Sequence, residues 1–170
     1  MTKHLEPHQH ESINGNILAG KYLTFTLGNE GYGIPILKVK EIIGIMRITD
    51  LPNLPSYLKG VVNLRDRVIP IMDLRLKFSM HPQDNTERTC IVVVEVMQPT
   101  GAILLGLLVD GVSEVVNYTG EEIEAPPALG SDQGGRYILG LAKRNDQVKI
   151  LLDIDRVVSN EDVISLADAA

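Results

Sequence analysis

Aromatic and sulfur-containing side chains are scarce in this sequence of 170 residues. Tryptophan is absent, aromatic residues make up only 4% of the chain, and Cys90 is the one cysteine. A single cysteine excludes an internal disulfide, and Cys90 lies within the apolar run CIVVVEV, where we expect it to be buried. With so few aromatic side chains, the hydrophobic 44% of the sequence must fill a core mainly with Val, Ile and Leu, which favour β-strands.

Positive charge and long apolar runs are also lacking. The formal net charge is −6, which argues against nucleic acid or an anionic membrane as the main partner, because both bind clusters of Lys and Arg. No apolar run approaches the roughly 20 residues of a membrane-spanning helix, and residues 1–17 lack the apolar core of a secretion signal. We therefore expect a cytoplasmic protein without direct membrane insertion, consisting of a flexible tail, 1–17, and an ordered part, 18–168.

One pattern of residues occurs twice along the chain. GVVNLRDRVIPIMDL, residues 60–74, shares its first glycine, one valine and both aspartates with GLAKRNDQVKILLDI, residues 140–154, at an offset of 80. YGIPILKVKEII, residues 32–43, matches LGLLVDGVSEVV, residues 105–116, at an offset of 73. The two offsets differ by an insertion in the second copy, which contains APPALGSDQGG. This agreement indicates an internal duplication.

Short strands separated by turn residues recur in both halves. Leu23, Phe25 and Leu27 alternate with polar side chains, as in a half-buried strand. The segment GNEGYG that follows them is typical of a hairpin turn. Because each half carries about five such strands, we predict an all-β fold with two small closed barrels in tandem, at about residues 21–80 and 88–155.

Helical patterns are few and short. Asp73 and Asp153 each follow the last strand of a half and are placed to N-cap the short helices LRLKF and IDRVV. The segment SNEDVISLADAA predicts a C-terminal helix over residues 160–168.

The same two aspartates are the strongest sign of catalysis. A carboxylate-pair hydrolase takes one acid from each half, and its carboxylates need small, hydrogen-bonding neighbours. Asp73 precedes Leu-Arg and Asp153 precedes Ile-Asp, and such bulky neighbours favour the helix cap. The hydrolase is retained as an alternative.

The sequence gives even less support for a metal site or for a catalytic nucleophile. His8 and His10 are spaced to chelate a metal, but no further ligand lies near them in the sequence, and Cys90 has no evident histidine partner. We therefore expect no metal, no cofactor and no catalytic residue, and favour a module that binds other proteins through its surface.

Three segments carry a resemblance to a known family. YLTFTLGNEGYGIPILKVKEI, PSYLKGVVNLRDRVIPIMDLRLKF and LGLLVDGVSEVV resemble the CheW family of chemotaxis coupling proteins, over about residues 20–168. The resemblance implies two five-stranded, SH3-like barrels around a shared core. It also implies a non-catalytic adaptor between methyl-accepting chemotaxis receptors and the histidine kinase CheA, placed at receptor clusters on the inner face of the membrane. The receptor tip is expected in the groove between the barrels, and the kinase at a barrel end.

Carried over by position, the resemblance implies receptor contacts at six residues and kinase contacts at two more, Glu124 and Leu129. The receptor candidates are Val39, Glu41, Gly60, Asn63, Arg65 and Asp66. A helix in a groove needs apolar contacts bounded by a few charges, and Arg65 is suited to donate a forked hydrogen bond. The alternatives stay open: Gly60 begins a strand, Arg65 is a solvated hairpin tip, and Val39 is part of the core.

The chain departs from the family pattern at two places. It has Asp66 where the family usually has glycine, and the second copy has Asp146 there too. Because aspartate tolerates left-handed backbone geometry better than most residues, we expect the fold to survive. Around Glu124 and Leu129 the usual basic and aromatic residues are also missing. Both departures predict a specialised coupling protein, and a chemosensory pathway that does not control flagella remains an alternative.

Overall fold

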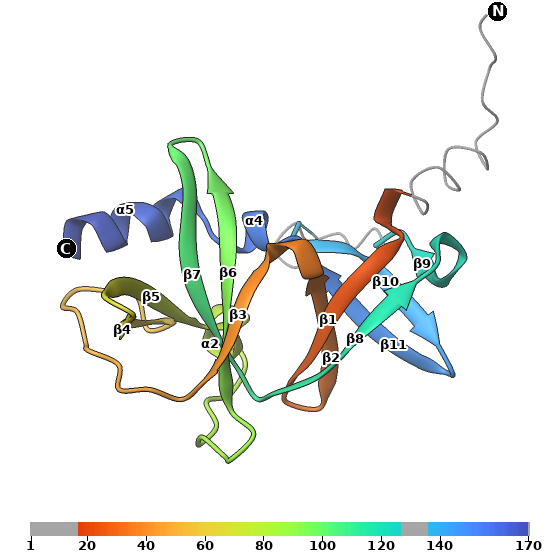
Figure 1. The fold of residues 1–170 in the computed structure, drawn as a ribbon, viewed down its shortest axis with the longest axis horizontal. Coiled ribbons are helices and arrows are strands. Elements are labelled where there is room, and N and C mark those ends of the chain that lie inside the picture. The colour runs from red at the N-terminus through yellow and green to blue at the C-terminus, as the bar shows by residue number, and fades with distance from the viewer. Residues whose placement is uncertain (1–16, 127–135, 170) are drawn as a thin grey trace, which may run out of the picture.

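The structure, a computed structural model, describes residues 17–126 and 136–169. Figure 1 shows two lobes side by side, each built mainly of short strands, with the C-terminal helix at the outer side of one lobe. Of the tail expected at 1–17, all but Ile17 lies outside the described residues.

The secondary structure is mostly β. The strands are β1 (Gly20–Leu27), β2 (Glu30–Pro35), β3 (Val39–Gly44), β4 (Leu58–Leu64), β5 (Arg67–Asp73), β6 (Cys90–Gln98), β7 (Gly101–Val109), β8 (Gly111–Tyr118), β9 (Ile123–Glu124), β10 (Ile138–Arg144) and β11 (Gln147–Leu152). The helices are α2 (Leu74–Lys77), α4 (Ile154–Val157) and α5 (Asn160–Ala169), and the 3-10 turns are η1 (Ile36–Lys38) and η2 (Gly120–Glu122). The predicted all-β class, short helices and C-terminal helix are confirmed.

Two curled sheets form the two barrels. One sheet has the strand order β3-β6-β7-β5-β4 and uses the middle of the chain, so we call it the central barrel. The other has the order β8-β1-β2-β11-β10-β9 and joins strands from both ends of the chain, so we call it the terminal barrel. Figure 1 shows the red to orange strands β1 and β2 together with the blue strands β10 and β11 in the terminal barrel, whereas α5 lies at the other lobe.

The barrels do not follow the sequence halves at 21–80 and 88–155. The first two strands of each half lie in one barrel and its later strands lie in the other, so the halves exchange strands. The duplication identifies which strands are alike, but a strand and its duplicate offer the same pairing edges. Exchanging equivalent strands between the barrels therefore keeps the same types of strand next to each other. The same sequence pattern is expected for exchanged and for unexchanged barrels.

The exchanged contacts have the same register in both barrels. β5 pairs in parallel with β7, with Ile71 opposite Gly106, and β11 pairs in parallel with β2, with Leu151 opposite Gly33. These four residues correspond through the offsets of 80 and 73. Gly33 and Gly106 are needed for packing, because a Cβ atom there would lie 2.9 Å from Leu151 and 2.5 Å from Ile71.

Three hydrophobic clusters stabilise the part of the chain that the structure describes. One lies within the terminal barrel and includes Tyr22 and Val116, and one lies within the central barrel and includes Val62 and Ile91. The largest takes side chains from both sheets and packs the barrels against each other. β6 supplies alternate residues to two clusters, because successive side chains of a strand point to opposite faces. This explains its continuous apolar sequence.

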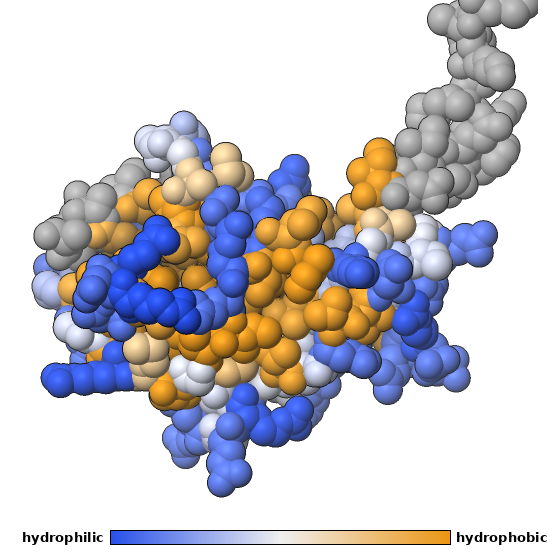
Figure 2. All heavy atoms as spheres, in the orientation of Figure 1, coloured by the Kyte–Doolittle hydropathy of each residue, from blue (hydrophilic) through white to orange (hydrophobic). Residues whose placement is uncertain are grey.

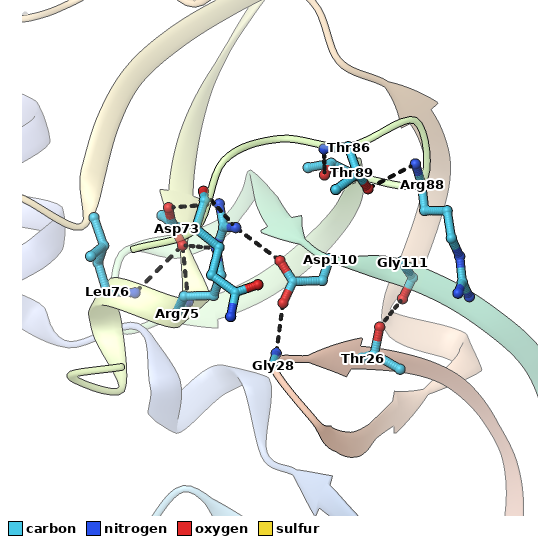
Figure 3. Close-up of polar contacts among 11 residues, drawn as sticks. Thr26, Gly28, Asp73, Arg75, Leu76, Thr86, Arg88, Thr89, Asp110 and Gly111 are labelled. Carbon is cyan, nitrogen blue, oxygen red and sulfur yellow. Dashed lines mark hydrogen bonds and ion pairs between the residues drawn. The ribbon is translucent and has the colours of Figure 1, made fainter. Parts of the chain in front are cut away.

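The two predicted helix caps behave differently. The carboxylate of Asp73 accepts hydrogen bonds from the backbone N–H groups of Arg75 and Leu76 at the start of α2, which confirms the predicted cap. Asp153 occupies the N-cap position of α4 but makes no capping side-chain bond, and its carboxylate lies 3.5 Å from Arg156. Asp73 also binds the buried guanidinium of Arg75, so its oxygens are occupied (Figure 3).

Candidate functional site

A hydrophobic surface covers the junction of the two barrels. Figure 2 shows hydrophobic side chains across the middle of this face, where Figure 1 places β3 between the lobes. β3 and β8 are the outermost strands of their sheets, and each exposes a large apolar side chain, Ile42 at 45% and Val115 at 49%. These two residues correspond in the duplication. η1, which leads into β3, exposes Leu37 at 89%.

Arg65 and Glu41 form a forked ion pair on the central barrel. Nη1 of Arg65 donates to Oε2 of Glu41 at 2.7 Å, and Nη2 donates to Oε1 at 2.5 Å. Glu41 is on β3 and Arg65 is in the turn between β4 and β5. Because β3 and β4 are the two outer strands of that sheet, curling of the sheet brings the two side chains together. The Arg65 guanidinium holds the pKa of Glu41 below its usual range.

The turn that carries Arg65 has an unusual backbone. Arg65 and Asp66 have φ angles of 50° and 64°, and the matching turn of the second copy has Asn145 and Asp146 at 52° and 61°. Two successive left-handed residues form the hairpin turn that matches strand twist, and Asn, Asp or Gly normally occupy it. Asp66 therefore fits its place, as predicted. Arg65 adopts a conformation that is costly for its residue type, and such strain is concentrated at functional sites.

Gly60 has a structural role that the sequence alone left open. It is buried with a φ of 136°, and a Cβ atom there would lie 2.1 Å from the backbone oxygen of Thr49. Thr49 bridges Val61 through two backbone hydrogen bonds of 2.8 and 2.9 Å, which tie the β3–β4 connection to β4. The glycine does admit a closely approaching backbone, as expected, but that backbone belongs to this chain.

The remaining receptor candidates lie at different depths. Val39 pairs with Val94, precedes a bulge in β3 and is half-buried against the shared core, so part of its surface is core. Asn63 is exposed on β4 opposite Val68. Arg65 and Glu41 are thus the only two receptor candidates that the structure joins by a side-chain hydrogen bond among the residues it describes.

The two kinase candidates are only partly visible. Glu124 is exposed on β9, and its carboxylate accepts a hydrogen bond of 2.7 Å from Nζ of Lys143 on β10. Leu129 lies outside the described residues.

A groove lies beside the Arg65–Glu41 pair on the central barrel and has a volume of about 550 Å³. It is lined by Lys40, Glu41, Leu64, Arg65, Arg67, Ile69, Val93, Glu95, Ala102, Ile103 and Leu104. Apolar walls with charged groups at the rim suit a partner helix or a side chain of a partner protein.

A second arginine cluster was not predicted from the sequence. Arg144 donates two hydrogen bonds of 2.7 Å to Glu122 and one of 2.8 Å to the backbone oxygen of Asn117, and its guanidinium lies 5.0 Å from the ring centre of Tyr118. This contact lowers the pKa of Glu122 to about 2. This cluster could have been suspected from the segment KRND, which contains Arg144 and aligns with the NLRD of the first copy.

The model of the CheW-like domain matches residues 21–162. This chain belongs to the CheW-like family. It is 38% identical to the chemotaxis protein CheW of Klebsiella aerogenes, with 93% of each chain covered. It is 30% identical to that of Treponema pallidum, with 86% of each covered. Among solved structures, the scaffolding protein TtCheW from Thermoanaerobacter tengcongensis matches with a TM-score of 0.76 and 28% identity, covering 85% of this chain and 95% of that one.

Family membership confirms the resemblance, and the match to TtCheW confirms the two SH3-like barrels that it implied. The terminal sheet has six strands where five were expected, because the two-residue β9 joins it. Among the described residues of this CheW-like chain, no helix is both long and apolar enough to cross a membrane. Within the same ranges, no three His, Cys, Asp or Glu side chains gather to hold a metal ion. His8 and His10, considered as ligands, lie outside them.

Proposed function

We propose that this chain is a non-catalytic adaptor that couples methyl-accepting chemotaxis receptors to the histidine kinase CheA at receptor clusters on the inner face of the membrane. The observation that carries the proposal is its membership of the CheW-like family over residues 21–162. The likeness to a protein described as a scaffold supports the same conclusion.

The surface at the barrel junction supports the receptor part of the proposal. A helical hairpin docks by apolar contacts along one face and by a few charges at the edge. Ile42 and Val115 supply exposed apolar contacts on β3 and β8, and the Arg65–Glu41 pair supplies charges at one side. In this proposal the strained Arg65 turn presents a guanidinium that a receptor carboxylate or carbonyl can bind.

The state of Asp73 supports an adaptor rather than a hydrolase. Both carboxylate oxygens of Asp73 accept hydrogen bonds, one of them from the helix N-terminus and both from the buried guanidinium of Arg75, which supports a structural role for this side chain. Asp153, which would be its catalytic partner, binds Arg156 instead.

In this proposal the kinase binds at one end of the terminal barrel. Glu124 and Lys143 form an exposed ion pair on β9 and β10 of the terminal barrel. Exposed pairs of this kind contribute little to stability, so both side chains are available to a partner. We assign the kinase contact to this end.

The test is binding of purified CheA regulatory domain and of a receptor cytoplasmic fragment, measured separately for the wild type and for Arg65→Ala. We expect Arg65→Ala to weaken receptor binding at least about tenfold, as loss of a charged hydrogen bond at an interface typically does. Kinase binding should stay within about twofold. Arg156→Ala is the control, because Arg156 is equally exposed but lies on α4 with Asp153. Equal receptor affinity for the wild type and both variants would contradict the role of Arg65. Failure of the wild type to bind either partner would contradict the function itself.

A further inference from the structure

α5 packs into a groove on the central barrel. Figure 1 shows α5 beside the lobe that contains β5 and β7, and Val163 and Leu166 of α5 line a hollow there with residues of both strands. Asp162 is fully buried and accepts hydrogen bonds from the hydroxyl of Tyr57 and, at 2.9 Å, from Nζ of Lys77. Apolar contacts and one carboxylate therefore hold α5 against Tyr57, β5 and β7, and we call this place the α5 groove.

The duplication places a second groove at the matching position of the terminal barrel. This terminal groove has a volume of about 480 Å³, and its lining includes Tyr32, Phe78, Arg136, Tyr137, Ile150 and Leu152. Tyr137 corresponds to Tyr57 through the offset of 80, and the carbonyl of each accepts a hydrogen bond from the N–H of the aspartate that ends its half, at 2.8 and 2.7 Å. Ser79, which also lines the terminal groove, corresponds to Ser159, the residue directly before α5. The terminal groove is therefore the counterpart of the α5 groove.

The chain leaves the terminal groove at the point where α5 begins in the other copy. Ser159 starts α5, because its Oγ accepts a hydrogen bond of 3.1 Å from the N–H of Asp162. Ser79 instead has a left-handed φ of 58°, and the N–H of Met80 donates back to the carbonyl of Arg75 at 2.8 Å. Such a left-handed turn ends a helix, here α2, so the chain turns away. Among the described residues, the terminal groove therefore receives no counterpart of α5.

The terminal groove offers the polar contacts that hold α5. The hydroxyl of Tyr137 accepts a hydrogen bond of 3.2 Å from Nη2 of Arg136, and within the described ranges it makes none as a donor. Tyr57 uses the equivalent proton to bind Asp162. The exposed guanidinium of Arg136 lies 5.2 Å from the ring centre of Tyr137, and Nζ of Lys77 lies 4.5 Å from that of Tyr57. Each groove therefore sets a cation beside a tyrosine hydroxyl, which suits a carboxylate.

Apolar side chains form the rest of the terminal groove. The rings of Tyr32, Phe78 and Tyr137 follow one another with 6.0 Å between neighbouring ring centres, and Ile150 and Leu152 of β11 lie beside them. The volume of the groove is within the range of about 300–1,000 Å³ that is common for binding sites. An apolar groove with a cation at its rim suits an amphipathic helix that carries an acidic residue.

We propose that the terminal groove binds an acidic amphipathic helix of a partner protein, in the way that the central barrel holds α5. The helix carries a carboxylate in its first turn and apolar residues one and four positions later, as Asp162, Val163 and Leu166 do in α5. This spacing places all three side chains toward one side of a helix. The carboxylate accepts a hydrogen bond from Tyr137 and pairs with Arg136. The helix belongs to another protein and not to a second copy, because Asp162 is already buried in its own groove. The inference goes beyond the proposed coupling function.

A synthetic peptide of residues 158–169 is the probe, because it carries the required pattern of residues. Its binding to the full, nitrogen-15-labelled chain is measured by NMR titration. We expect concentration-dependent shifts of the amides of Tyr137, Ile138 and Ile150, with the amide of Tyr57 unchanged because α5 stays in place. No shift at the terminal groove with a large excess of peptide overturns the proposal. Shifts at Tyr57 in place of Tyr137 also overturn it, because the peptide then replaces α5.

Substitutions in the chain and in the peptide identify the contact. Tyr137→Phe keeps the ring and should weaken binding about tenfold, as loss of a charged hydrogen bond does. Arg136→Gln should weaken it up to about fivefold. Arg88→Gln is the control, because Arg88 is an exposed arginine outside the groove lining, and it should leave the affinity unchanged.

A double-mutant cycle separates a direct contact from a change in the helicity of the peptide. A peptide with Asp162→Ala should bind the wild type and Tyr137→Phe with affinities within about twofold of each other, because the coupled pair is already broken. A full tenfold difference would contradict the contact. Sedimentation of the chain without peptide tests the other occupant. A dimer that Tyr137→Phe dissociates would identify a second copy in the groove and overturn the proposal.

Discussion

Single residues that correspond in the two copies often have different roles. Arg65 occupies a left-handed turn position that is strained for arginine, while its counterpart Asn145 occupies the same backbone geometry with little strain. Arg65 compensates for this strain with a forked ion pair to Glu41, and Asn145 needs none. A costly residue at an exposed turn, paired across the sheet, supports the proposed role of Arg65 in receptor binding.

Replacing Asp66 by glycine tests the geometry of this turn. Glycine adopts positive φ without steric cost, so we expect Asp66→Gly to raise the free energy of unfolding by about 0.5 kcal/mol, measured by urea denaturation. Asp146→Gly is the matched control, because Asp146 has nearly the same φ, 61° against 64°, and should stabilise the protein equally. Only Asp66→Gly should alter receptor affinity. Unchanged affinity for every receptor fragment would show that Asp66 does not influence partner choice.

The carboxylate of Glu122 should titrate at unusually low pH. The Arg144 hydrogen bonds lower its pKa from 4.5 to about 2. Because the folded-state pKa is depressed, the stabilisation from this pair is present above about pH 4.5 and is lost as the pH falls toward 2. An NMR titration of the side-chain carboxyl carbon should show a midpoint near 2. In Arg144→Gln the midpoint should rise toward 4.5, and a wild-type midpoint already at that value would contradict the ion pair.

At the scale of elements, each barrel has a place where a connecting segment packs directly against the backbone of a strand. β4 has a bulge just before Gly60, and there the β3–β4 connection crosses β4 in direct backbone contact. β10 has the same bulge before Gly140, where a Cβ atom would lie 2.8 Å from the backbone oxygen of Glu124. The two-residue strand β9 is the counterpart of the Thr49 bridge. In each barrel, therefore, a short segment completes the sheet by packing against a glycine, where no side chain blocks its approach.

Gly60→Ala should damage this closure severely. The added Cβ would overlap the Thr49 oxygen at 2.1 Å, and the φ of 136° is strained for alanine. We expect a loss of about 3 kcal/mol of unfolding free energy or failure to fold. Gly44→Ala is the control, because no atom lies within 4 Å of its Cβ position. Thermal denaturation should show a large fall in midpoint for Gly60→Ala alone, and equal midpoints would contradict the close approach.

At the scale of the whole molecule, strand exchange makes the two barrels one folding unit. The largest hydrophobic cluster takes side chains from both sheets, and each half of the chain supplies strands to both barrels. The relative placement of surfaces on the two barrels therefore depends on the shared cluster and on the segments that pass from one barrel to the other.

Fragments of the chain distinguish exchanged from tandem barrels. A fragment of residues 17–80 holds β1 to β5, which the exchange divides between two sheets, so we expect no cooperative unfolding when it is monomeric. A fragment of residues 39–109 holds every strand of the central barrel and should retain β-structure with a cooperative, if weakened, transition. Circular dichroism during thermal unfolding measures both. A stable monomeric 17–80 fragment beside an unfolded 39–109 fragment would contradict the exchanged topology.

The sequence by itself determined the strand pattern, the duplication, the Asp73 helix cap and the family, because alternation, turn residues and motifs are local properties of the chain. It also indicated Arg65, but it did not show the partner Glu41, or that Gly60 contacts Thr49. Those facts depend on which strands become neighbours when the sheets curl. The exchange of strands was likewise decided only in three dimensions, since duplicated strands offer identical edges and the sequence does not state which copy each one pairs with.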